Sequence, residues 1–441
     1  MNTDDRKHNI VNLLLENLSL FYLIGLVGIA NGFVLPFLKV IHASITHSYF
    51  MTAIGEALFI FSLASMGIIW GFAFDIAKER RVVIIFALEV IAFFVFITSE
   101  IRSSIGYVLV RFLTGFFGSS IYAYIMKEVS YKYRPGQRIT VFFLALLLMN
   151  FFLGAGSAIA IVLTLWTHWR AVIRIYAFVL GLGALLAFPF LGSNPALISR
   201  KGEQEVGGLL RFFVMGWSEF AKKKTNRLLA IQGIFGCIPW GALGLFGIYA
   251  IMERMNVDFL FVGTLAAMAS IGYYFASLIF PYLDKIRRRE EFKKLTYIVA
   301  ISIFLQAILY ILSLLLPPSF IAYEHIYTIG DLISSPTILL EKPFVSFIIL
   351  FATLYFVSSI PGPVTRNIVS DINSYELSGS ALMILRFFEN LGQSLGLIIA
   401  GYIVEKSGSF WIPLILLTLF WFVCGAIWIP IGSVWEKEQR K

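Results

Sequence analysis

Long apolar stretches separated by short charged segments dominate the hydrophobic pattern of this chain. Stretches of about 20 apolar residues are the length that a helix needs to cross a bilayer, and the sequence holds twelve of them. They cover 18–41, 52–74, 82–99, 105–126, 139–165, 171–192, 228–252, 258–283, 295–315, 344–364, 381–404 and 410–433. The pattern therefore predicts an all-α integral membrane protein with twelve transmembrane helices. No cleavage-site pattern precedes the first span, which is expected to act as its own insertion signal.

The composition indicates that lipid surrounds most of the chain, and it does not fit a soluble globular protein or a nucleic-acid-binding protein. Hydrophobic residues make up 59% of the 441 residues and charged residues 14%, against roughly 45–50% and about 25% in soluble domains. The net charge of +9 would suit nucleic acid only as a basic patch on a folded surface. Because the cations lie in short loops, we expect a lipid bilayer and no nucleic acid as partner.

The loop cations are divided unequally between the two sides of the membrane. One side, with both termini and with Arg366 assigned to the loop after 344–364, holds 26 Lys and Arg, and the other side holds 5. Positively charged loops stay in the cytoplasm. Both termini are therefore predicted to be cytoplasmic, and we expect the protein in the plasma membrane.

The same pattern divides the chain into two halves. Residues 1–192 form an N-terminal six-helix bundle, 228–441 form a C-terminal six-helix bundle, and 193–227 form a cytoplasmic central loop. Within this loop, 207–220 has the aromatic and basic residues of an amphipathic helix at the inner leaflet. It is interpreted as a tether between the bundles or as a regulatory, lipid-sensing element.

Corresponding basic loops follow the second and the eighth span. Each has an Asp at the helix exit and a cluster of cations after it: Asp75 with Arg80 and Arg81, and Asp284 with Arg287 and Arg288. These Asp–Arg sets are predicted to pair, or to cap a neighbouring helix, and to hold the cytoplasmic faces together as a gate. The alternative is that the cations only report topology. Duplicated halves around a central cavity are typical of alternating-access transporters.

Several motifs resemble the major facilitator superfamily. Gly71, Asp75 and the Arg80-Arg81 pair are similar to its loop Gly-x-x-x-Asp-Arg-x-Gly-Arg-Arg, and Arg111-Phe-Leu-Thr-Gly115 is similar to its Arg-x-x-x-Gly motif. Asn390-Leu-Gly-Gln393 is similar to spinster-like members, which are associated with lysolipids and related amphiphiles. The resemblance implies two pseudo-symmetric six-helix bundles, no cofactor, and secondary transport of a small organic or amphiphilic solute by alternating access, coupled to protons.

Ionisable residues inside the spans are few, and each is a candidate functional residue. Glu56 and Arg111 enter the second and fourth spans from the same side at about 6–10 Å depth, counted at 1.5 Å per residue, so an ion pair is expected. It is interpreted either as a protonation-sensitive coupling element or as a static contact inside one bundle. Glu89 in 82–99 is a further candidate with no evident partner.

The eleventh span, 381–404, is the most polar. Arg386, Glu389, Asn390 and Gln393 recur at i, i+3, i+4 and i+7 and form one stripe that lipid does not tolerate. They are predicted to contact substrate or protons, or alternatively to lock helices together.

Helix-weakening residues occupy corresponding places in the first and seventh spans. They are Asn31-Gly32 with Pro36, and Pro239-Trp240-Gly241. Such residues free backbone groups for solute binding, or serve close helix packing.

Two other function classes compete with transport. An intramembrane enzyme lacks support because all five histidines lie outside the predicted spans and the sequence holds no metalloprotease, serine-hydrolase or nucleotide-binding motif. We therefore expect no catalytic residues and no metal. The second alternative is a non-transporting sensor or scaffold on a transporter fold. We expect a monomer.

Overall fold

The computed structural model describes most of the chain, and every regular element in the described part is a helix. The described residues are 18–32, 34–67, 69–70, 74, 79–132, 148, 151–152, 154–164, 166–191, 206–269, 271–276, 279, 282–283, 286–287, 289–315, 328–340, 342–373 and 378–439.

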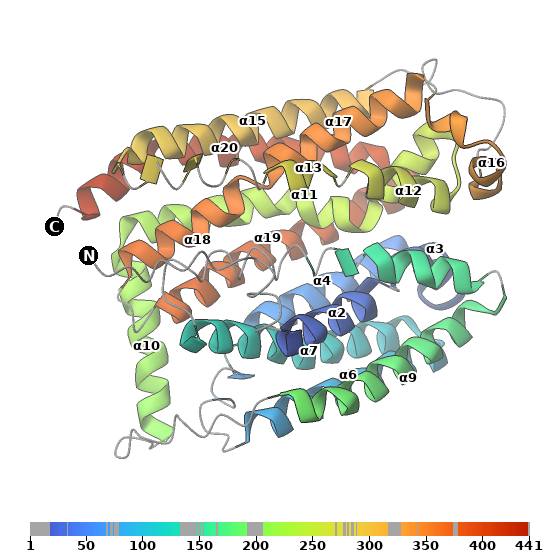
Figure 1. Ribbon diagram of the computed structural model, residues 1–441, viewed down its shortest axis with the longest axis horizontal. Helices are drawn as coiled ribbons and strands as arrows, with labels where there is room; N and C mark the ends of the chain where they lie inside the picture. The colour runs from blue at the N-terminus through green and yellow to red at the C-terminus, as the bar shows by residue number, and fades with distance from the viewer. Residues whose placement is uncertain are drawn as a thin grey trace, which may run out of the picture.

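The helices before residue 192 form one group, called here the N-half. They are α2 (Leu18–Gly32), α3 (Val34–Ile41), the π-helix η1 (His42–Thr46), α4 (Tyr49–Ser65), α6 (Arg80–Glu100), α7 (Ser104–Lys132), α9 (Trp169–Ala187) and the short 3₁₀ turn η2 (Phe188–Phe190). α4 packs on α7, and α6 packs on both α7 and α9. The N-half lies below in Figure 1.

The helices from residue 224 onward form the second group, the C-half. They are α11 (Lys224–Met255), α12 (Phe259–Ala269), α13 (Ile271–Ala276), α15 (Phe292–Leu315), α16 (Ile329–Ser334), η5 (Pro336–Leu340), α17 (Lys342–Ser358), α18 (Pro361–Ile372), α19 (Ser378–Ser407) and α20 (Trp411–Gln439). α11 packs on α19 and α20, and α15 packs on α20 and α17. The two halves meet mainly where α4 lies along α19.

Two ends of the molecule are distinguished by their helix termini. At the basic end, α6 and α15 begin and α7, α18 and α20 end, on the left in Figure 1. At the opposite end, α4, α7 and α9 begin and α11 and α19 end.

The prediction of twelve spans is consistent with the structure, which describes fewer of them in full. Within the described residues, 8 helices are long and apolar enough to cross a membrane, or 9 if the bent pair Lys39–Thr46 and Tyr49–Ser65 is one span. The fifth predicted span, 139–165, is represented by the apolar helix Gly154–Thr164, and the eighth, 258–283, by α12 and α13.

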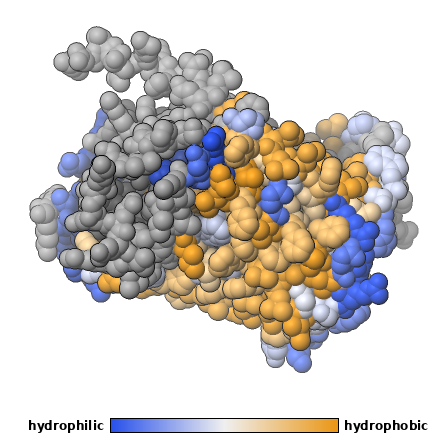
Figure 2. Space-filling view, turned by 90° about the horizontal axis from the view of Figure 1, so that it is seen from below, coloured by the Kyte–Doolittle hydropathy of each residue, from blue (hydrophilic) through white to orange (hydrophobic). Residues whose placement is uncertain are grey.

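Large apolar side chains cover the outer faces of the helices. Phe86 and Phe93 of α6 are 59% and 57% exposed, and Phe178 of α9 is 70% exposed. In Figure 2 hydrophobic residues cover the middle of the face in view, and hydrophilic residues gather toward the ends. Such a band fits the hydrocarbon layer of a bilayer, so the chain is an all-α multi-pass membrane protein.

The helix α11 continues through Pro239 without a break. Position 241 has no room for a side chain, because a Cβ on Gly241 would lie 2.0 Å from the carbonyl oxygen of Gln393 in α19. Of the two interpretations of Pro239-Trp240-Gly241, the structure shows close packing rather than a broken helix. Asn31 lies in α2, and its side chain is outside the described residues.

The predicted amphipathic helix is present as α10 (Val206–Lys222), which crosses the basic end at a steep angle to the other helices (Figure 1). Trp217 packs edge-to-face on Phe387 and Phe388 of α19, and Phe220 stacks on Phe388. These contacts join the central segment to the same helix that carries the polar stripe.

Candidate functional site

The predicted contact between Glu56 and Arg111 is present inside the N-half. Arg111 donates from Nε to Glu56 Oε1 at 2.7 Å and from Nη2 to Oε2 at 2.6 Å. Tyr107, which sequence reasoning did not single out, donates its hydroxyl to Oε1 at 2.5 Å. The guanidinium also lies 4.0 Å from the centre of the Phe59 ring. We call Glu56 and Arg111 the inner pair.

Close helix contact places the inner pair. Gly115 of α7 touches α4 so closely that a Cβ would lie 2.3 Å from the carbonyl oxygen of Phe59. This brings Arg111, one turn earlier on α7, within reach of α4. The side chains of Arg111 and Glu56 are 4% and 10% exposed. The carboxylate and the guanidinium satisfy each other with the bidentate geometry that Arg and carboxylate groups favour, and the charges balance.

A second ionic cluster lies on α18 and α19. Arg386 contacts Glu389 one turn later on α19, with 3.2 Å between Nη1 and Oε2. Arg366 of α18 approaches the same oxygen at 3.9 Å through Nη2. The two arginine side chains keep 29% and 20% exposure. We call Arg366, Arg386 and Glu389 the arginine cluster.

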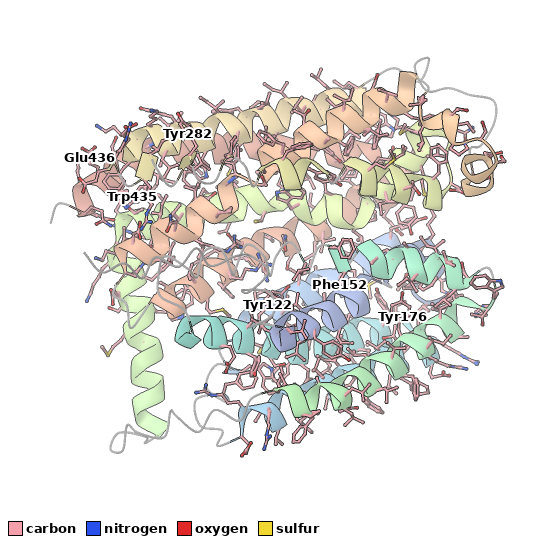
Figure 3. The ribbon with its side chains drawn as sticks, viewed as in Figure 1. Tyr122, Phe152, Tyr176, Tyr282, Trp435 and Glu436 are labelled. Atoms are coloured by element: carbon pink, nitrogen blue, oxygen red, sulfur yellow. The ribbon has the colours of Figure 1, made fainter. Side chains whose placement is uncertain are left out.

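The arginine cluster lies where the halves meet. Arg386 lies 6.0 Å from the centre of the ring of Tyr122, which belongs to α7 of the N-half. Tyr122 is labelled in Figure 3 between the two groups of helices. Its hydroxyl is within electrostatic reach of both arginines. The cluster itself belongs to the C-half, and it faces a side chain of the N-half.

The remaining stripe residues contact neighbouring helices. Asn390 is buried and donates to the carbonyl oxygen of Ile60 in α4 at 3.5 Å. Ser394, one turn further, donates to the carbonyl oxygen of Ala57 at 2.9 Å. The backbone of Gln393 lies against Gly241 of α11. The stripe faces the protein interior, as its spacing predicts, and one side of it joins α19 to α4.

The assignment of Arg366 to a cytoplasmic loop is wrong. The helix α18 begins at Pro361, with Pro in its first turn, and continues to Ile372, so that Arg366 lies within a helical span together with α17. Proline at the start of a helix lacks only an amide hydrogen that would be unpaired there. The cluster of Pro361, Gly362 and Pro363 therefore marks a new helix and not a loop.

The arginines of the basic loop of the N-half form contacts that the sequence pattern did not single out. Arg80 donates to the carbonyl oxygen of Phe74 at 2.9 Å and lies 3.7 Å from Glu128 at the end of α7. Arg81 pairs with its neighbour Glu79 at 2.8 Å. Gly71 and Asp75 lie outside the described residues, so their gating role stays a prediction.

The C-half has a similar contact at its basic end, with an acid that the sequence pattern did not single out. Arg287 forms a two-pronged pair with Asp371 near the end of α18, with Nε at 2.8 Å from Oδ2. Asp284 and Arg288 lie outside the described residues. Arg80 with Glu128, and Arg287 with Asp371, each join helices of one half at the basic end. Glu128 follows the fourth predicted span and Asp371 follows the tenth. The sequence pattern predicts neither acid as a partner of the basic loops.

At the opposite end, the halves are in direct contact. The backbone amide of Tyr49 in α4 donates to Glu405 of α19 at 2.8 Å. The ammonium of Lys39 lies 5.0 Å from the ring of Tyr249 and 5.3 Å from that of Phe410. Phe410 also packs edge-on against Tyr49. These residues, called here the end contacts, close the molecule at this end with a few polar and aromatic contacts.

The last candidate from the sequence is Glu89, and a metal site is the last kind of site to consider. Glu89 faces Gly181 of α9, and its Oε1 is buried without a hydrogen-bond partner. Within the described residues, no group of three or more His, Cys, Asp or Glu side chains is arranged to hold a metal ion.

Comparisons with known proteins now identify the family. The model of the Major Facilitator Superfamily matches residues 20–340. The chain belongs to the major facilitator superfamily. It has 15% identity and a TM-score of 0.65 with the crystal structure of a bacterial homologue of the human lysosomal transporter Spinster, in an inward-facing and unoccupied conformation, over 96% of this chain and 97% of that one.

A second similar structure is that of the nucleoside transporter NupG, with 15% identity, a TM-score of 0.61, and coverage of 96% of this chain and 99% of the other. No curated protein matches the sequence at a significant level. Because the family match covers most of the chain, this protein is a multi-pass membrane transporter of that superfamily.

Proposed function

We propose that this transporter is a secondary active carrier that moves a small organic or amphiphilic solute by alternating access, coupled to protons. The observation that supports it most is the arginine cluster, in which Arg366, Arg386 and Glu389 of the C-half face Tyr122 of the N-half. A group placed between two halves is exposed to one side of the membrane at a time when the halves rock against each other.

The moving bodies in this proposal are residues 1–192 and 228–441, with 193–227, which includes α10, as the link between them. The end contacts are suited to a gate because they consist of a few hydrogen bonds, from the amides of Tyr49 and Lys39 and from the hydroxyl of Tyr249, and a few ring contacts. With the basic end in the cytoplasm, the described conformation is closed toward the outside. The cell membrane is the proposed location, with the termini cytoplasmic.

Glu389 is the proposed proton-coupling residue. Its carboxylate contacts Arg386 at 3.2 Å and Arg366 at 3.9 Å, so that it lies next to two guanidinium groups. Rearrangement of the halves changes the distance to these partners, so that the carboxyl group takes up a proton in one conformation and releases it in another. In Glu56 the corresponding oxygens are held by Arg111 and Tyr107 within one half, which favours a static role for the inner pair.

Glu389→Gln tests the proposal in proteoliposomes. We expect the variant to lose solute accumulation driven by a pH step while it keeps counterflow exchange, because exchange requires no net proton movement. Glu100→Gln is the matched control, since Glu100 also pairs with an arginine, Arg174, but lies half-exposed at the opposite end. If Glu389→Gln still concentrates solute under the pH step, coupling resides elsewhere, with Glu56 and Glu89 as the next candidates.

A further inference from the structure

The arginine cluster carries more positive charge than its own acid compensates. Two guanidinium groups share one carboxylate, so its net charge is +1, and Glu389 is the only carboxylate in contact with either arginine among the described residues. An uncompensated charge within a membrane span is costly. An uncompensated positive charge where the two halves meet is therefore suited to binding an anion.

We propose that Arg366 and Arg386 bind an oxyanion of the transported solute, a carboxylate or a phosphate. This inference rests on the proposed function and names its substrate class. Arginine suits this role because its planar fork of five donors matches the oxygens of a carboxylate or phosphate. It also stays protonated at every physiological pH.

The geometry differs from that of a saturated pair. The contacts of Glu389 with Arg386 and Arg366 measure 3.2 Å and 3.9 Å, both at Oε2, whereas the inner pair has two shorter contacts, at 2.6 and 2.7 Å. The arginines of the cluster also remain 20–29% exposed. Donors that are loosely paired and still accessible are available to an incoming anion.

Tyr122 provides a contact from the other half. It faces both arginines from α7, so a bound oxyanion lies between C-half cations and an N-half phenol. Binding therefore depends on the distance between the halves, which is the quantity that alternating access changes.

The charge balance specifies the direction of coupling. When the site is empty, two arginines and an ionised Glu389 sum to +1. When a monoanion is bound and Glu389 takes up a proton, the sum is again +1, because the anion replaces the carboxylate charge. Protonation of Glu389 therefore releases the arginines for the solute, and proton and anion travel together as an electroneutral symport.

Matched ligands test the oxyanion site on purified protein without requiring transport. The probes are hexanoate against hexanamide and hexyl phosphate against hexanol, at equal ionic strength. We expect only the charged member of each pair to raise the thermal midpoint, by mass action. Arg366→Gln and Arg386→Gln each weaken binding by about tenfold or more, the effect of a lost charge-assisted hydrogen bond. Arg174→Gln, the control, leaves binding unchanged.

Two further variants separate a binding role from a structural one. Glu389→Gln removes the internal competitor, so it should tighten oxyanion binding and remove the pH dependence that the carboxyl group confers on it. Arg366→Lys and Arg386→Lys keep the charge but lose the fork, and an intermediate affinity is expected even if the glutamine variants do not fold. Equal stabilisation by charged and neutral members, or an unchanged affinity in the arginine variants, overturns the proposal.

The transport assay separates this inference from the proposed function. In proteoliposomes, uptake of labelled hexyl phosphate, after subtraction of the uptake by protein-free vesicles, should respond to a pH step and not to a potassium diffusion potential. Uptake of the neutral probes without the anions leaves the carrier in place and refutes the oxyanion site. Binding of the anions without flux of any probe supports the site and refutes the carrier.

Discussion

The inner pair and the arginine cluster contain the same residue types and yet have opposite properties. In the inner pair, Glu56 and Arg111 join two helices of one half, their charges cancel, and the side chains are 10% and 4% exposed. In the arginine cluster the charges do not cancel, the contacts are longer, and both arginines stay partly exposed where the halves meet. A balanced pair within one rigid half stabilises that half, whereas an unbalanced set between two halves is suited to binding.

The largest expected effect concerns the inner pair. Arg111→Gln leaves the Glu56 carboxylate buried with Tyr107 as its main partner, and breaking a buried pair in this way costs about 3–5 kcal/mol. The unfolding free energy in a mixed-micelle denaturant titration should fall by that amount. The matched comparison is Arg366→Gln, in which Glu389 keeps Arg386, and a loss under about 1 kcal/mol is expected for this partly exposed contact. Equal losses in both variants contradict the distinction.

A second variant replaces the inner pair and its hydrogen-bond partner Tyr107 by apolar residues. Glu56→Leu, Tyr107→Phe and Arg111→Met together remove every charge and the hydroxyl, and such replacements are often neutral or stabilising by about 1–4 kcal/mol. We expect the triple variant to recover the stability that Arg111→Gln loses. Counterflow exchange should remain near the wild-type rate. A folded triple variant without exchange assigns a transport role to the pair.

The smallest expected effect concerns the end contacts. Glu405→Gln weakens the hydrogen bond from the Tyr49 amide across the halves, and exposed charged contacts contribute about 0.2–1 kcal/mol. The open population at the opposite end should rise by a factor of about 1.4 to 5, measured as the distance between spin labels on α4 and α19. Glu438→Gln is the control, because Glu438 accepts from the backbone amide of Lys224 within the C-half, at the basic end. Equal shifts in both variants exclude a gating role for Glu405.

Local sequence information predicts the inner pair well. Glu56 and Arg111 enter their helices from the same side at similar depth, and helical rise alone fixes that depth. The helix character of 206–222, where α10 lies, follows from its aromatic and basic composition in the same way. Both inferences depend on positions along one helix or on two helices that begin at the same end.

Sequence reasoning was less successful with Arg366, Glu128 and Asp371. Arg366 follows Pro361-Gly362-Pro363, which is typical of a loop, and only the start of α18 shows that it belongs to a helix. Arg287 pairs with Asp371, 84 positions away, an acid that sequence reasoning did not single out. The choice between a near and a distant acid depends on which helices pack together, and hydropathy does not contain that information.

The sequence by itself determined that lipid surrounds most of the chain. It also determined the number of predicted spans, the distribution of loop cations and the family resemblance. These depend on summed hydrophobicity and charge, which are properties of each segment taken separately. The tertiary structure decided which ionisable residues share a partner, and it gave Glu389 two arginines where the sequence suggested one. It also decided that α4 and α7 pack closely enough to bury one pair, while the second cluster stays accessible between the halves. Charge compensation and burial are set by neighbours from distant segments, so they exist only once the helices are packed.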